Sequence, residues 1–197
     1  MKLLFVNCCI SQRGTGSRTH ALAEAFLTAF LASHPGLETE EVTPETLLAL
    51  KPFDPEMLDR RDTLAKAGDF GAPVYDLARQ FRSADAVVVA APFWDLSYPA
   101  ALRTYIEYIS AVGLTYHYTD AGCCGDCAAE HLVYLTSGGE VEREDSVGVI
   151  HWRQLAAMFG IPQFDYVFAG GLDAHPETAG ETLTAARSLA ETLARTL

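Results

Sequence analysis

Basic residues are scarce in this sequence. Of its 197 residues, 14 are Lys or Arg and 26 are Asp or Glu, which gives a formal net charge of -12 at pH 7. Nucleic acids and anionic membranes are themselves negative, so neither is an expected partner. No apolar run approaches the roughly 20 residues that a membrane-spanning helix requires. With 49% hydrophobic residues, the composition is that of a folded chain rather than a disordered one.

Cysteines are few, and their arrangement does not suit a secreted disulfide framework. The five cysteines are an odd number, placed as Cys8-Cys9 and Cys123-Cys124-x-x-Cys127. A reducing cytoplasm is therefore the expected location. The apolar start of the chain passes directly into a polar loop, so it is not expected to be a signal peptide.

The three clustered thiols fall short of the four ligands that a zinc or iron–sulfur site normally needs. Either His117 or His131 would have to complete the set, and the adjacent Cys123 and Cys124 are poorly placed to bind one metal. We therefore predict a loop of free thiols and no metal site.

Two common nucleotide-binding motifs are missing from the first 30 residues. The loop after the apolar run 3–6 has no Lys followed by Ser or Thr, and it has no G-x-G-x-x-G pattern. It does contain four hydroxyl residues and two glycines within nine residues, just before a helical pattern. Backbone N–H groups and the positive end of the helix dipole converge there. Ser17 or Thr19 could simply cap the helix, but one cap explains one hydroxyl. We predict a site for a single terminal phosphate, such as that of FMN, with these residues: Ser11, Ser17, Arg18 and Thr19.

Strand-like and helix-like patterns alternate along the chain. The run AVVVAA at 86–91 is typical of a central parallel strand buried on both faces. The alternation predicts an α/β doubly wound sheet of five parallel strands in the order 2-1-3-4-5, with helices on both faces and a single domain over residues 1–197. Residues 43–71 suggest only a loop and short helical pieces, and residues 114–119 suggest a small hairpin. The expected strands are 3–6, 37–42, 86–91, 131–136 and 164–169.

Three loops follow strands that should end at the same sheet edge, where doubly wound folds bind ligands. The first is the hydroxyl loop. The second offers aromatic walls for a flat ring, and the third offers small residues that let backbone N–H groups approach it. Core packing or an ordinary turn could explain either of the last two loops alone. Their agreement favours a cofactor site with these further residues: Pro92, Phe93, Trp94, Asp95, Leu96, Thr136, Ser137, Gly138 and Gly139.

Several segments, in this order, are similar to one known family. They are the hydroxyl loop, APFWDLSYPAALRTYIEYI, LTYHYTDAG, TSGG and FGIPQFDYVFAGGL. They resemble the flavodoxin-like FMN-dependent NAD(P)H:quinone oxidoreductases and azoreductases. The resemblance implies a homodimer with FMN at each interface pocket. It also implies ping-pong hydride transfer from NADH or NADPH, through the flavin, to a quinone or azo acceptor.

Side chains would contribute little chemistry in such an enzyme, because the flavin performs it. No catalytic side chain is therefore predicted. His117 and Tyr118 are candidates for a substrate wall, and it is equally reasonable that they are half-exposed strand residues. The family commonly has Asn where Asp95 stands, and TSGG is one residue shorter than the usual turn.

Two other functions remain open from the sequence. One is an electron carrier of the flavodoxin or iron–sulfur flavoprotein type, although a carrier is usually shorter between Gly113 and His131. The other is a phosphate-binding module without redox activity, which would be colourless.

Overall fold

Five parallel strands form the centre of the protein in the computed structural model, which describes residues 1–11, 13–141 and 146–197. The strand order is β2-β1-β3-β6-β7. The predicted five-stranded parallel sheet is confirmed. The predicted order 2-1-3-4-5 does not match this numbering exactly, because a separate two-stranded hairpin, β4–β5, precedes β6. The sheet strands are β1 (Lys2–Asn7), β2 (Glu38–Val42), β3 (Ala86–Ala90), β6 (His131–Ser137) and β7 (Gln163–Ala169).

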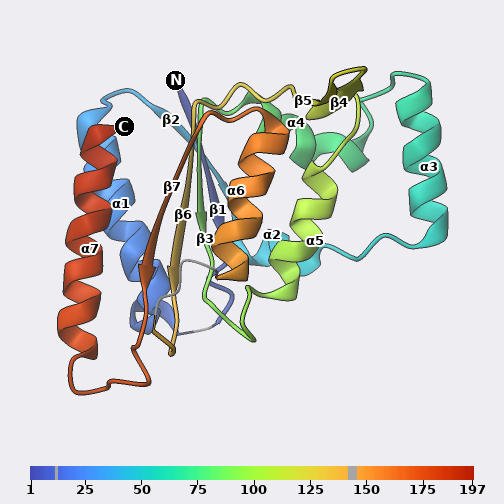
Figure 1. Cartoon of the computed structure of the whole chain (residues 1–197). Coiled ribbons are helices and arrows are strands. Elements are labelled where there is room, and N and C mark those ends of the chain that lie inside the picture. Colours follow the sequence, from blue (N-terminus) through green and yellow to red (C-terminus); the bar gives the residue numbers. More distant parts are fainter. Residues whose placement is uncertain (12, 142–145) are drawn as a thin grey trace.

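Helices cover both faces of the sheet (Figure 1). On one face, α1 (Arg18–Ser33) and α7 (Ala179–Thr196) pack together over the strands. Small alanines of α7, spaced four residues apart, are buried there and allow close packing. The other face is covered by α4 (Asp76–Ser83), α5 (Ala100–Ile109) and α6 (Val147–Phe159). Since both faces are covered, the residues of β3 are all buried, as their apolar sequence predicts.

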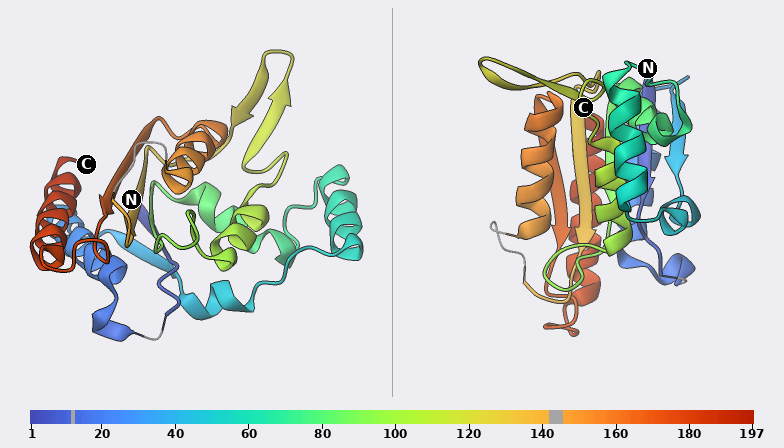
Figure 2. Two further views of the ribbon diagram at one scale, coloured as in Figure 1. Left: turned by 60° about the horizontal axis from the view of Figure 1, so that its bottom comes forward. Right: turned by 90° about the vertical axis from the view of Figure 1, so that its right-hand side faces the viewer.

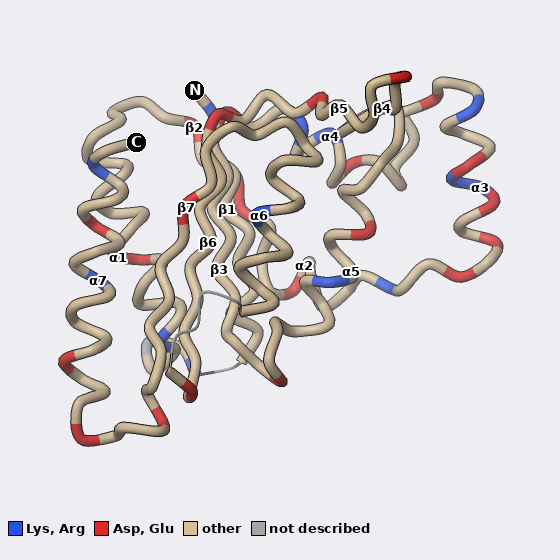
Figure 3. The backbone as a smooth tube through the Cα atoms, viewed as in Figure 1, with Lys and Arg blue, Asp and Glu red and all other residues tan. Residues whose placement is uncertain are grey.

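The segment before α4 contains more helix than its sequence predicts. It holds α2 (Pro44–Ala49), α3 (Pro55–Lys66) and the short 3-10 helix η2 (Pro73–Tyr75). α3 buries no residue and stands beside the main body (Figure 2), with charges of both signs along it (Figure 3). Its inward face is only half-buried, with Leu64 and Ala65 packed on the body, so its apolar pattern is weak. Arg61 attaches it to the body by donating hydrogen bonds to the carbonyls of Glu107 (3.0 Å) and Ser110 (2.7 Å).

The hairpin consists of β4 (Tyr116–Thr119) and β5 (Gly122–Gly125). Its first strand falls within the predicted segment 114–119, and its second lies beyond it. The hairpin is at the amino edge of the sheet, where the strands begin (Figure 1). Its base touches the C-terminal end of α6, and a Cβ added to Gly125 would lie 2.0 Å from the backbone of Phe159 and Gly160. Within the described ranges, no helix is long and apolar enough to cross a membrane.

Candidate functional site

The three predicted loops meet at the carboxyl edge of the sheet. They line a cavity of about 150 Å³, and a larger hollow of about 470 Å³ beside it is lined by Asp95 and Leu96. Thr136, also predicted, is fully buried and is not among the residues that line either space. The predicted residues that line the smaller cavity are Ser11, Ser17, Arg18, Thr19, Pro92, Phe93, Trp94, Ser137, Gly138 and Gly139.

The first loop is held in place by the start of α1. Ser17 is the N-cap of the helix, and its hydroxyl accepts a hydrogen bond from the backbone N–H of His20 at 3.3 Å. Thr19 is buried, and its Oγ1 lies 2.6 Å from the Oγ of Ser137, so this contact joins the first loop to the third. Burial raises the pKa of Cys9 to about 11. Its thiol therefore stays neutral beside the first loop.

The second loop makes a tight turn at the mouth of the cavity. The backbones of Trp94 and Ser97 exchange two hydrogen bonds, at 3.1 and 2.8 Å. The two residues between them, Asp95 and Leu96, have φ values of 50° and 62°. This is the left-handed region, which is uncommon for a non-glycine residue and strained for leucine. Trp94 remains 41% exposed and Leu96 68% exposed, so the turn presents apolar side chains beside the cavity.

The third loop packs closely at its two glycines. A Cβ at Gly138 would lie 3.0 Å from the Phe93 ring, and one at Gly139 would lie 2.6 Å from a carboxylate oxygen of Asp173. A larger residue at Gly138 would press on the Phe93 ring, and one at Gly139 would displace the Asp173 carboxylate. The backbone can therefore come within reach of a ligand without a side chain filling the space.

Two lining residues, Arg13 and Asp173, were not predicted. Asp173 accepts a hydrogen bond from Nη1 of Arg18 at 2.7 Å. It follows β7, the fifth strand of the sheet, which also ends at the carboxyl edge. The rule that identified the other three loops could therefore have identified this one as well. The ion pair is largely exposed and contributes little to stability, but it places a carboxylate next to the expected phosphate.

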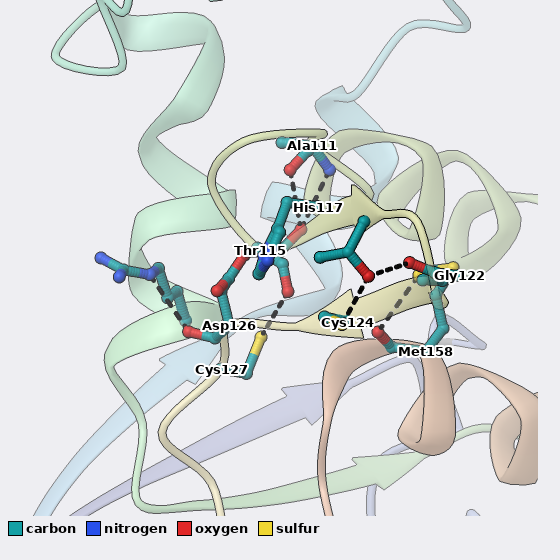
Figure 4. Close-up of polar contacts among 11 residues, drawn as sticks. Ala111, Thr115, His117, Gly122, Cys124, Asp126, Cys127 and Met158 are labelled. Atoms are coloured by element: carbon teal, nitrogen blue, oxygen red, sulfur yellow. Dashed lines mark hydrogen bonds and ion pairs between the residues drawn. The ribbon is translucent and has the colours of Figure 1, made fainter.

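His117 and Tyr118 are not brought to this cavity. Both belong to β4, at the opposite edge of the sheet. His117 Nδ1 lies 2.8 Å from Oδ2 of Asp126 (Figure 4). The chain returns to the amino edge because α5, which follows β3, runs antiparallel to the strands. Within one chain these two residues therefore form no wall of the site.

The thiols of Cys124, in the hairpin, and of Cys127, just after it, contact different residues. Thr119 Oγ1 lies 3.7 Å from the Sγ of Cys124, and Cys127 Sγ donates to the carbonyl of Thr115 at 3.6 Å (Figure 4). Burial raises the pKa of Cys127 to about 12. All five cysteines are free. In the part of the chain that the structure describes, no three His, Cys, Asp or Glu residues are arranged to hold a metal.

The sheet and the cavity at its carboxyl edge define a doubly wound α/β protein with a polar ligand site. Comparison with known proteins gives a more specific assignment. The family described by a flavodoxin-like fold matches residues 1–193. The chain is 30% identical over 184 residues to FMN-dependent NADH:quinone oxidoreductase 2 of Clostridium acetobutylicum, covering 87% of each chain.

Two further relatives match almost the whole chain. The FMN-dependent NADH:quinone oxidoreductase of Clostridium beijerinckii is 29% identical over 201 residues, with 98% of each chain covered. The crystal structure of an azoreductase from Bacillus anthracis has a TM-score of 0.86 and 26% identity, with 100% of each chain covered. The chain belongs to the flavodoxin-like family of FMN-dependent NADH:quinone oxidoreductases and azoreductases.

Proposed function

We propose that this protein is an FMN-dependent oxidoreductase that passes a hydride from NADH or NADPH to a quinone or azo compound. The observation that carries the proposal is the cavity formed jointly by the three loops. The names of its relatives support the same reaction. We also propose that residues 1–197 form one domain and that the protein works in the cytoplasm.

The residues present fit FMN. The hydroxyls of Ser11 and Ser17, the guanidinium of Arg18 and the start of α1 suit a terminal phosphate. The close contacts at Gly138 and Gly139 leave backbone, without side chains, at the third loop. When bound, FMN would supply the redox chemistry by accepting a hydride and passing both electrons on.

The protein would contribute binding, orientation and walls. Thr19 and Ser137 hold the phosphate loop against the third loop. Trp94 and Phe93, on the second loop, would bound the space for a flat ring. Such a space accommodates one flat partner at a time, so the nicotinamide and the acceptor would have to bind in turn.

This reaction predicts a purified protein that is yellow or becomes yellow with added FMN. NADH or NADPH without an acceptor should bleach the flavin absorption, and a later pulse of benzoquinone should restore it. Initial-rate plots should give parallel double-reciprocal lines, because the two substrates alternate. Bleaching by dithionite but by neither nicotinamide would favour an electron carrier, and a failure to take up FMN would favour a phosphate-binding module without redox activity.

We further propose a homodimer. A hollow of about 320 Å³ next to the cavity is lined by exposed apolar residues, including Leu96, Val141 and Val147. A monomer rarely exposes such a cluster. His117 and Tyr118, which lie far from the site of their own chain, would then be available as a wall for the site of the second chain.

Light scattering at micromolar concentration is expected to report twice the chain mass of 21.4 kDa. A Val147→Lys change should shift the protein towards monomer, because it buries a charge in the interface. Leu189→Lys is the matched control, since Leu189 is equally exposed at 56% but lies on α7, on the other side of the sheet. A stable wild-type monomer would contradict the shared pocket.

A further inference from the structure

The turn Trp94–Ser97 needs an external support. Its two central residues both have positive φ, and neither is a glycine. Such conformations are strained and persist only where the surroundings fix them. The two hydrogen bonds inside the turn close it but do not fix its direction relative to the sheet.

The residues on either side of the turn provide that support. Before it, the N–H of Phe93 donates to the carbonyl of Ser137 at 2.9 Å, and the Phe93 ring packs 5.3 Å from that of Phe168. After it, the buried Tyr98 makes a hydrogen bond between its hydroxyl and Nδ1 of His151. The rings of Tyr98 and His151 are nearly parallel, at 14°, with centroids 6.0 Å apart. The turn is thus attached to β6 at one end and to α6 at the other.

The Tyr98–His151 contact is suited to a fixed structural role. Burial, together with the nearby charge of Arg103, lowers the pKa of His151. Burial also raises the pKa of Tyr98 to about 12. Both side chains are therefore neutral at neutral pH, and their hydrogen bond requires no buried charge.

We propose that Tyr98 and His151 are positioning residues that hold the turn Trp94–Ser97 at the mouth of the cavity and so determine how tightly the flavin is bound. The inference rests on the proposed FMN function. It does not make either residue catalytic, because neither is among the residues that line the three spaces at this edge. Their effect on the ligand would pass through the backbone of the turn.

The test is the dissociation constant of FMN, measured by titration of flavin fluorescence. Tyr98→Phe removes one hydroxyl and keeps the ring, and it should raise the constant by about tenfold. His151→Leu should have a similar effect. His151→Asn should bind FMN almost as tightly as the wild type, unlike His151→Leu, because an amide can form a hydrogen bond with Tyr98 in place of Nδ1. In the double variant Tyr98→Phe, His151→Leu the effects should not add, since both changes remove the same bond.

Tyr108→Phe is the control variant. Its hydroxyl donates to the carbonyl of Lys51 at 3.1 Å, and neither residue lines the cavity. It should leave both the affinity and the visible flavin spectrum unchanged, whereas Tyr98→Phe should shift the spectrum. Unchanged affinity and spectrum in both Tyr98→Phe and His151→Leu would overturn the inference. Wild-type protein that binds no FMN would instead contradict the proposed function.

Discussion

The double variant Ser17→Ala, Thr19→Ala is expected to bind FMN about 10- to 100-fold more weakly than the wild type, because it loses hydrogen bonds to a charged phosphate. Ser17 lines the cavity directly. Thr19 contributes in addition through its contact with Ser137, which joins two loops of the site. Equilibrium titration with FMN measures the change. Unaltered affinity would mean that the phosphate binds elsewhere.

Loss of a helix cap must be separated from loss of a ligand contact, because Ser17 performs both roles. Thr43→Ala provides the control. Thr43 caps α2 in the same way, with its Oγ1 accepting from the N–H of Thr46 at 3.2 Å, and it does not line the cavity. Each cap deletion should lower the free energy of unfolding by about 1 kcal/mol. Only the Ser17 change should alter FMN affinity.

A Gly125→Ala change is expected to lower the free energy of unfolding by about 3 kcal/mol. The new Cβ would lie 2.0 Å from the backbone nitrogen of Gly160 and from the carbonyl carbon of Phe159. Backbone atoms cannot move aside as a flexible side chain can, so the hairpin would have to separate from α6. The N–H of Cys127 would then lose its bond to the carbonyl of Phe159, at 3.2 Å.

Urea unfolding followed by circular dichroism would measure this loss. Gly180→Ala is the matched control, because a Cβ at Gly180 meets nothing within 4 Å and the residue lies in α7. Alanine is the better helix former by up to about 1 kcal/mol, so this variant should be as stable as the wild type or slightly more so. Equal stability of the two variants would contradict the packing described here.

The parts of the fold that the sequence predicts well are those in which one physical requirement dominates. β3 lies between two layers of helices, so its composition alone identifies it. The three loops are predictable because parallel strands end at one edge, and most of the expected residues do line the cavity there. The assignment of individual FMN contacts to these residues stays a prediction.

Other features depend on contacts that a sequence pattern does not contain. α3 is attached partly through the hydrogen bonds of Arg61 to the carbonyls of Glu107 and Ser110. The link between Tyr98 and His151 joins residues 53 positions apart. For His117 and Tyr118, resemblance to a family segment indicated proximity to the ring, whereas the direction of α5 places them at the far edge of their own chain.

β2 has a consequence for how copies of this chain can meet. It is an edge strand, and carboxylates occupy three of its five positions, Glu38, Glu40 and Glu41. Lys2 lies 2.5 Å from Glu40, and Glu41 accepts a hydrogen bond from Asn7 at 2.9 Å. Two chains that extended their sheets through β2 would bring these carboxylates together, which is destabilising. The strand thus disfavours self-association of the sheet through this edge.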